Sequence, residues 1–458
     1  MSGMGRDETV KDLELQLNLF DPDMRRQALE SLADMAARGN VSVEEKKPYV
    51  NLHSHTSFSF NAYGYSPSRF AWEACKAGLE VAGIVDFDCL DGVEEFLEAG
   101  TQLNLKTIAG FETRVFIPEY SDKVINSPGE PGVYYLVGTG FTEPPAPDTS
   151  PGRTLADMAN RARERNIAMM EKINDHLGEV TIDYEEDVIP LTPSGNATER
   201  HMLQAYEDKA RETFDDPDEL AAFWADKLGV EEDEVRGLLD DIPSLKGLIR
   251  KKLMKRGGVG YAKPDAGTFP DIDEVVKMTL DCGALPSGCW LDGTSEGEAD
   301  PMRHFKFLKD KGIPTLTIIP DRNWDIDDPE QKQLKLDNLE AAVKAGQELE
   351  MPILVGTEMN KHGQKFVDEF NTPELSPYRD IFLDGAHVAW GHTLLKMTAG
   401  MGYTGEWADE QFGSDTAARN EFFRKLGEGE YPEFHVFQEL SELDEEADAD
   451  QIMQIAKG

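Results

Sequence analysis

The amino-acid sequence predicts an α/β fold in which βα units surround a parallel sheet or barrel. Apolar strand-like segments and amphipathic helical segments alternate from residue 49 onward, as βα units do. Long, charge-rich helical patterns interrupt the alternation between residues 151 and 260, and it resumes at Ile272. His, Asp or Glu residues stand at several predicted strand ends, where a barrel carries its active site.

The first predicted elements follow from apolar periodicity and turn residues. Residues 8–38 predict one or two amphipathic helices that form an N-terminal extension. Pro67 suits a first helical turn and Gly78 suits the residue after a helix end. The expected strands cover 49–52, 81–85, 107–109 and 133–137, with helices at 67–77 and 92–100.

The second half of the chain predicts an inserted helical subdomain and then the rest of the barrel. Helices are expected at 154–177, 199–212, 218–228, 232–239, 272–280, 301–311 and 329–349, and strands at 285–289, 315–319 and 353–355. One more helical region precedes an acidic stretch, Glu439–Asp450, that we expect to be partly mobile or solvated. The predicted domains are 1–48, 49–150, 151–260 (the insertion), 261–370 and 371–458 (the C-terminal extension).

The net charge of −42 excludes some classes of partner. Binding to a phosphate backbone depends on Lys and Arg, so long DNA or RNA is a poor candidate substrate. No apolar run approaches the ~20 residues of a membrane span. A small anion could still reach a local positive site.

The cysteines and the N-terminal residues predict a cytoplasmic protein. The four cysteines, Cys75, Cys89, Cys282 and Cys289, do not have the spacing of a disulfide framework or a CxxC clamp, so reduced thiols are expected. The N-terminal residues are polar and lack the apolar segment of a secretory signal.

Two histidines one residue apart, His53 and His55, follow an apolar approach. Alternate residues of a strand point to the same face, so both imidazoles can reach one metal ion. The chain contains only nine histidines, so two histidines at this spacing are unlikely to occur by chance. The alternative is a pair of hydrogen-bonded or surface histidines, because an HxH motif needs its structural context.

Three further strings follow in order: Ile84–Gly92 (IVDFDCLDG), Ala109–Glu112 (AGFE) and Val355–Asn360 (VGTEMN). Together with HxH, their order and spacing resemble the PHP (polymerase and histidinol phosphatase) family of metal-dependent phosphoesterases, over about residues 49–365. The resemblance implies a distorted (β/α)7-type, TIM-like PHP barrel. It also includes a helical insertion like that of the family's nucleotide-phosphatase branch.

The resemblance implies that His53, His55, Glu112 and Glu358 hold the first metal, with Glu358 where the family has Asp. The family's other metal positions fall here on Phe60 or Asn61, Phe87, Asn360, His201 and Tyr135. None of the second-metal positions, Phe60 or Asn61, Phe87 and Asn360, carries a good ligand, and phenylalanine cannot coordinate at all. One complete ligand set therefore survives and the neighbouring set is emptied. Two imidazoles and two carboxylates suit Zn, Mn or Fe, with one ion expected and at most two.

Other polar residues near the predicted strand ends are candidates for supporting roles. Asp86 could orient a ligand histidine, and Asp88 could do the same or form a turn. Arg322 could hold a phosphate through bidentate bonds or pair with a loop carboxylate. Arg200 and Lys361 neighbour proposed site residues and could contact phosphate, or lie solvated. His387 and His392 could form a second cluster, or pack.

These observations predict a metal-dependent hydrolase of a small phosphate monoester. His53, His55, Glu112 and Glu358 would hold the metal, and His201 would act as general acid or as a ligand of a second ion. Asp86 would support the site, and Arg322 would neutralise phosphate charge, with Arg200 and Lys361 as further substrate contacts. The alternatives are a protein that binds a metal or small anion without turnover and a metal-dependent hydrolase of a non-phosphate substrate.

Overall fold

The computed structural model describes residues 3–265 and 267–457, which form two compact units. The first unit contains the described residues up to Ser57, Asn61–Leu155, and those from Pro270 onward. The second unit contains Phe58–Phe60 and Ala156–Phe269. The second unit is mainly the segment between β4 and β5, in the region where the sequence predicts an insertion.

Seven strands lie in chain order in one sheet of the first unit. They are β1 (Val50–Ser54), β2 (Val81–Phe87), β3 (Lys106–Phe116), β4 (Val133–Thr139), β5 (Leu285–Trp290), β6 (Thr315–Ile318) and β7 (Ile353–Val355). Just after β7, the Glu358 N–H donates to the His53 carbonyl at 2.7 Å, and the His55 N–H donates to the Glu358 carbonyl at 2.9 Å. These two bonds join the ends of the sheet, and the predicted α/β barrel is confirmed.

Strand β4 runs against its neighbours, which the alternating pattern did not predict. β4 pairs antiparallel with β3 and with β5, whereas the other neighbouring strands pair in parallel. A parallel connection usually needs a crossover helix, and the link from β3 to β4 holds only the 3-10 turn Pro118–Tyr120. The carboxyl end of β4 therefore lies at the opposite end of the barrel from those of the other six strands.

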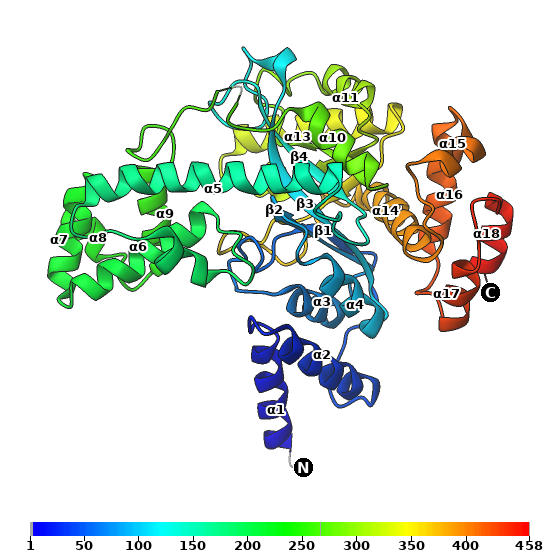
Figure 1. The fold of residues 1–458 in the computed structure, drawn as a ribbon, viewed down its shortest axis with the longest axis horizontal. Helices are drawn as coiled ribbons and strands as arrows, with labels where there is room; N and C mark the ends of the chain where they lie inside the picture. The colour runs from blue at the N-terminus through cyan, green and yellow to red at the C-terminus, as the bar shows by residue number, and fades with distance from the viewer. Residues whose placement is uncertain (1–2, 266, 458) are drawn as a thin grey trace. The chain divides into compact units, whose positions relative to one another are not determined.

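Helices surround these strands, so the strands are buried on both faces (Figure 1). Ser66 caps the first of them by accepting from the Arg69 N–H at 3.0 Å, and Pro67 occupies the first turn, as predicted. The surrounding helices are α3 (Pro67–Lys76), α4 (Val93–Leu103), α10 (Ile272–Asp281), α11 (Pro301–Asp310), α12 (Asp321–Trp324), α13 (Pro329–Glu348) and α14 (Arg379–Ala399).

The terminal segments of the first unit are helical. At the N-terminal end are α1 (Gly3–Gln16) and α2 (Pro22–Ala37), and Arg25 of α2 donates from Nε to Glu95 of α4 at 2.9 Å. The C-terminal segment holds α15 (Glu406–Phe412), α16 (Thr416–Glu428), α17 (Phe434–Ser441) and α18 (Ala449–Ala456).

The acidic stretch Glu439–Asp450 is mostly exposed but carries a few buried apolar residues. Trp407 donates from Nε1 to the Ala447 carbonyl at 2.8 Å, and Leu440 and Ile452 are fully buried. Apolar residues spaced among the acidic ones supply this packing, which the charge run alone does not reveal. Most of the acidic side chains in the stretch are exposed, as expected, and the buried apolar residues anchor it.

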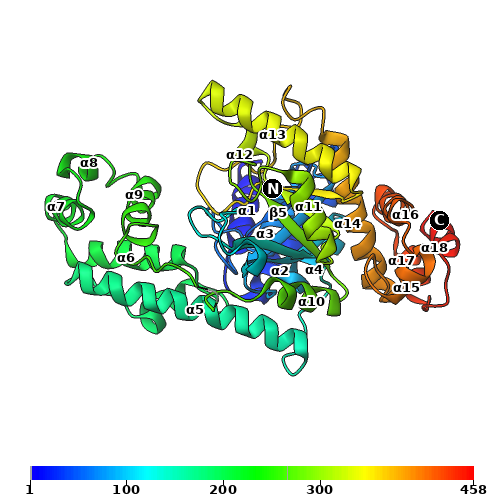
Figure 2. The ribbon, with the colours of Figure 1, turned by 90° about the horizontal axis from the view of Figure 1, so that it is seen from above.

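The second unit has its own hydrophobic core, in which Tyr206 and Trp224 are fully buried. Tyr206 donates from its hydroxyl to the Met170 carbonyl at 3.0 Å. Its helices, drawn in green in Figure 2, are α5 (Ser150–Leu177) from Ala156 onward, α6 (Glu199–Thr213), α7 (Pro217–Leu228), α8 (Glu232–Arg236) and α9 (Ile242–Ile249).

The structure bears on the predicted reduced cysteines and on the predicted lack of a membrane span. All four cysteines are free, with Cys89 buried and the other three half-buried. Over residues 3–265 and 267–457, no helix has the length and apolar character needed to cross a membrane.

Candidate metal centre

Strands β1 and β3 bring His53, His55 and Glu112 together inside the barrel. Nε2 of His53 lies 3.4 Å from Oε2 of Glu112, and Nε2 of His55 lies 3.1 Å from the same oxygen. One ligand atom from each residue lies within 4.8 Å of the others, and all three side chains are buried. Among the residues that the structure describes, no other group of three His, Cys, Asp or Glu side chains meets this distance.

The electrostatics of this cluster favour an ionised carboxylate. Burial alone would raise the pKa of Glu112, but Coulombic attraction to His53 and hydrogen bonds to both histidines lower it to about 2. Nδ1 of His53 is buried and has no hydrogen-bond partner within the described part of the chain. A buried ring nitrogen without a partner costs stability, and functional sites are where such groups are retained.

Two buried polar residues fix the backbone around His55. Asp86, at the end of β2, accepts from the Thr56 N–H at 2.7 Å with Oδ1 and from the Thr56 hydroxyl at 2.6 Å with Oδ2. Asn61 donates from Nδ2 to the His55 carbonyl at 2.8 Å. Asp86 thus contacts the residue after His55, and it supports the site through the backbone.

Phe87, where the resemblance expects a metal-binding His, covers one face of His55. The two ring centroids are 4.1 Å apart, and the rings are nearly parallel at 22°. An aromatic ring cannot ligate a metal but can hold the imidazole in one orientation. The lost ligand position is therefore filled by packing.

The Glu358 carboxylate does not join the His53–His55–Glu112 cluster. Arg322, in α12 just after β6, donates to Oε1 of Glu358 at 2.7 Å, and Gln364 donates to Oε2 at 2.8 Å. Glu358 and Met359 have φ of 64° and 56°, a backbone conformation that is uncommon for residues other than glycine. Through its backbone Glu358 joins β7 to β1, while its side chain is occupied by Arg322 and Gln364.

His201 and Arg200 belong to the second unit, at the start of α6. Nδ1 of His201 accepts from the Thr198 N–H at 3.0 Å and so completes a capping box. Burial lowers the pKa of His201 to about 4, so its imidazole is neutral near pH 7. Within the same unit the Phe60 ring lies 5.4 Å from His201 and 5.9 Å from the Arg200 guanidinium.

The remaining predicted site residues make structural contacts or face solvent. Lys361 is exposed, and its backbone N–H donates to Oε1 of Gln364 at 2.8 Å. Nε2 of His387 lies 3.7 Å from Oε1 of Glu80, which precedes β2. His392 accepts from the Tyr403 N–H at 2.9 Å with Nδ1 and pairs with the Gly140 carbonyl at 3.1 Å with Nε2.

Three residues around the centre were missed as functional candidates: Thr56, Asn61 and Gln364. Thr56 follows HxH directly, and a hydroxyl next to ligands at a strand end was an available signal. Asn61 was considered only as a lost ligand. Gln364 carries no sequence signal, because its role depends on the path of the loop after β7.

Most of the motif strings lie at or just after strand ends, as predicted, whereas the AGFE string lies inside β3, short of its end at Phe116. HxH ends β1, Asp86 ends β2, Glu112 lies on β3, and Glu358 follows β7. The fold is a distorted PHP-type barrel. Phe87 and Asn360 stand where the resemblance expects further metal ligands.

Comparisons with known proteins match this chain only in part. No family model matches it. It is 31% identical over 102 residues to an error-prone DNA polymerase of Mycolicibacterium paratuberculosis and 34% identical over 82 residues to one of Cutibacterium acnes. These matches cover 22% and 18% of this chain but only 8% and 7% of the two polymerases.

Two solved structures are similar to the PHP-type barrel at low identity. An amidohydrolase from Chromobacterium violaceum with bound sulfate and no metal aligns with a TM-score of 0.46 at 12% identity, over 73% of this chain and 96% of that one. A protein from Bifidobacterium adolescentis, provisionally assigned as a metal-dependent phosphoesterase, aligns with a TM-score of 0.44 at 16% identity, over 71% and 94%. Neither likeness decides an activity.

Proposed function

We propose that this protein is a metal-dependent hydrolase whose centre is formed by His53, His55 and Glu112. The observation that carries the proposal is that these three buried side chains bring ligand atoms within 4.8 Å of one another. His53 and His55 lie where β1 ends, and Glu112 of β3 pairs with Phe87 at the end of β2. Active sites of such barrels assemble at the carboxyl ends of the strands. The proposal assigns the centre to catalysis.

The donor set fits one divalent ion. Two imidazoles and a carboxylate are the three protein ligands of many catalytic zinc sites, and the same donors suit Mn and Fe. The low pKa of Glu112, about 2, keeps its carboxylate in the form that a metal needs. Only one such cluster lies in the described ranges, which supports one ion.

A divalent ion bound there would supply Lewis acidity and lower the pKa of a coordinated water. The chain's own residues would hold and orient the reactants. Asp86 and Asn61 keep the His55 backbone in place through Thr56 and the His55 carbonyl. Phe87 excludes water from one face of the His55 ring by stacking on it.

A small phosphate monoester is the substrate class that we infer. Arg322 is the supporting residue, because its side chain is 44% exposed while its partner Glu358 is only 12% exposed. A guanidinium can hold two phosphate oxygens in a bidentate pair. A phosphate oxygen would therefore compete with Glu358 for Arg322, and Glu358 would then be released as a potential fourth ligand.

The experiment combines metal analysis with a panel of phosphate esters. We expect the purified protein to contain close to one Zn, Mn or Fe per chain and to release phosphate from at least one small monoester. Glu112→Gln should lose the metal and the activity together. Glu98→Gln, an exposed glutamate on α4, is the matched control and should keep both.

Two other functions have a specific observation in their favour. A binding protein without turnover is favoured by the Arg322–Glu358 ion pair, which occupies two candidate site residues. Bound metal with no hydrolysis of any ester would support it. A non-phosphate hydrolase is favoured by the apolar Phe87 beside His55, and turnover of amides or carboxylic esters alone would support that function.

A further inference from the structure

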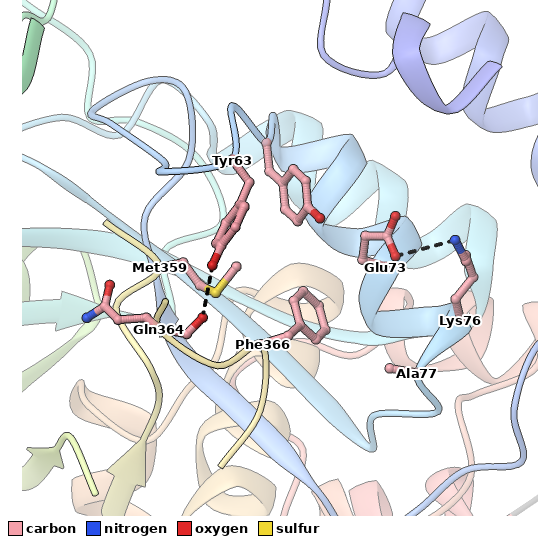
Figure 3. Close-up of a pocket in the computed structure, with 8 residues that line it drawn as sticks. Tyr63, Glu73, Lys76, Ala77, Met359, Gln364 and Phe366 are labelled. Atoms are coloured by element: carbon pink, nitrogen blue, oxygen red, sulfur yellow. Dashed lines mark hydrogen bonds and ion pairs between the residues drawn. The ribbon is translucent and has the colours of Figure 1, made fainter. Parts of the chain in front are cut away.

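A pocket of about 400 Å³ lies in the first unit between α3 and the segment after β7 (Figure 3). Its apolar lining comes from three aromatic rings, Tyr63, Tyr65 and Phe366, together with Met359 and Ala77. This volume is within the range of about 300–1,000 Å³ that is common for small-molecule sites. Aromatic rings that line a pocket of this size favour a planar, ring-shaped ligand.

The charged side chains at the pocket are already paired with one another. Glu73 accepts from Arg69 at 2.5 Å and lies 3.4 Å from Nζ of Lys76. Lys76 in turn donates to Glu14 of α1 at 2.6 Å. Since no net charge is left to balance a ligand charge, the pocket suits an uncharged molecule.

Hydrogen bonds hold both walls of the pocket in position. On one wall, Oδ1 of Asn61 accepts from the backbone N–H groups of Tyr63 and Tyr65 at 2.8 and 3.2 Å. On the other wall, Gln364 donates to Glu358 at 2.8 Å. Tyr63 joins the two walls, because its hydroxyl donates to the Gln364 carbonyl at 3.3 Å (Figure 3). A preformed pocket loses little conformational entropy when a ligand binds.

The same residues attach the pocket to the metal centre. Asn61 also donates to the His55 carbonyl, and Glu358 exchanges backbone hydrogen bonds with His53 and His55. Hydrogen bonds of Asn61 and Glu358 therefore connect the pocket walls to the backbone of the metal centre. None of the residues that line the pocket belongs to the His53–His55–Glu112 cluster.

We propose that this pocket is a binding site for a small, uncharged, planar aromatic molecule. The ring would lie among Tyr63, Tyr65 and Phe366, with the thioether of Met359 as a further apolar contact. The site is separate from the proposed hydrolytic centre, so it stands whether or not the protein hydrolyses phosphate esters.

Indole is a suitable probe, and its binding to the full chain can be measured by saturation-transfer NMR. We expect a dissociation constant of about 1 mM or tighter. Ala77→Phe should fill the pocket and abolish the transfer signal. Ala37→Phe, at an exposed helix end on α2, is the matched control and should bind indole as the wild type does.

A second variant tests the same proposal if Ala77→Phe does not fold. Tyr63 is 39% exposed, so Tyr63→Ala should fold and weaken indole binding about threefold to tenfold. Phe434→Ala removes an aromatic ring that is 76% exposed on α17 and should leave binding unchanged. No binding by the wild type, or equal binding by Tyr63→Ala, would overturn the proposal.

Discussion

At the scale of single residues, the candidate metal centre depends on buried polar groups that do not themselves bind metal. Asp86 is 2% exposed and uses both carboxylate oxygens on Thr56. Replacing a residue that orients a metal ligand typically weakens metal affinity by about 10- to 100-fold. A substitution of Asp86 therefore tests whether its hydrogen bonds to Thr56 hold the metal ligand His55 in position.

Asp86→Ala should weaken metal binding about tenfold to a hundredfold, because the Thr56 N–H loses its acceptor and the His55 backbone is released. The same loss should lower the free energy of unfolding by about 1–3 kcal/mol. Asp86→Asn should keep most of the metal affinity and most of the stability, since its amide can accept from the Thr56 N–H and donate to the Thr56 hydroxyl. Zinc titration and urea unfolding measure the two effects.

Asp122→Asn, at an exposed position, is the control and should change stability by less than about 0.5 kcal/mol. If Asp86→Ala bound zinc as tightly as the wild type, the positioning role of Asp86 would be refuted.

Glu298, in the loop after β5, should make stability depend on pH. Burial raises the pKa of Glu298 to about 7, against an ordinary value of 4.5, even though its carboxyl accepts from the backbone N–H groups of residues 291–293. The folded state thus holds this proton more tightly than the unfolded state. The contribution of Glu298 to the free energy of unfolding is fully present below pH 4.5 and is lost as the pH rises through about 7.

The expected loss of stability from Glu298 between pH 5.5 and pH 8 is about 2 kcal/mol. Glu298→Gln cannot ionise, so its stability should fall by that much less over the same interval. Glu439→Gln, on an exposed part of α17, is the control for urea unfolding at the two pH values. An identical pH profile for Glu298→Gln and wild type would contradict the assignment.

The sequence predicted part of the centre at the residue scale. Strand alternation was enough to place His53 and His55 on one face, and the resemblance added Glu112. The pairing of Glu358 with Arg322 and Gln364 was not predictable, because it depends on a left-handed backbone at Glu358 and Met359. Side-chain partners in loops depend on the path of the chain, which periodicity does not describe.

At the scale of elements, the start of α6 tests two roles for His201. Its Nδ1 accepts from the Thr198 N–H in the capping box, whereas the sequence predicts a general acid. His201→Ala should cost about 1 kcal/mol of stability through the lost cap. His201→Gln should retain the cap, because Gln is a usual capping-box residue at this position.

Urea unfolding and phosphate release, measured on both variants, separate the two roles. A structural role predicts that His201→Gln keeps stability and activity. If His201→Gln stays as stable as the wild type yet loses activity, the side chain acts in catalysis.

The contact between the end of β4 and α14 is a second test at the element scale. Gly140 has φ of +74°, and a Cβ there would lie 2.4 Å from Cδ2 of His392. Gly140→Ala should therefore destabilise the protein by roughly 2–4 kcal/mol, from the backbone strain and from displacement of His392.

Gly400→Ala, at the end of the same helix, is matched in φ at +71° but meets nothing within 4 Å. It should cost only about 1 kcal/mol, from the backbone alone. Equal melting temperatures for the two variants would show that α14 does not pack on the β4 end through His392.

The elements were predicted better than their directions. Most strands and helices of the barrel occur close to the expected ranges, since apolar period and turn residues act locally. However, β3 extends to Phe116, well beyond the expected 107–109, and the short helix α12 was not predicted. The antiparallel direction of β4 was not predicted, because an apolar strand looks the same in either direction. The signal that was present is the Pro- and Gly-containing link from β3 to β4, which has no helical pattern.

At the scale of the whole molecule, the composition predicts weak binding to polyanions but does not give the reason for the acidity. The chain has 88 Asp and Glu residues against 46 Lys and Arg residues. Like charges at this density repel one another and destabilise the compact state. The described chain also contains many ion pairs, such as Arg236 with Glu232 and Arg424 with Glu428, which oppose that repulsion locally.

Salt should therefore stabilise this protein overall. The Debye length falls from about 30 Å at 0.01 M to about 3 Å at 1 M, so salt removes long-range repulsion while short ion pairs lose less. The melting temperature should rise with NaCl over this range by at least about 2 °C, the shift that 1 kcal/mol produces in a domain of 150–250 residues. Glucose at matched osmolality controls for solvent effects without screening. A melting temperature that falls with NaCl would mean that the ion pairs, and not the net charge of −42, dominate the electrostatic free energy of this fold.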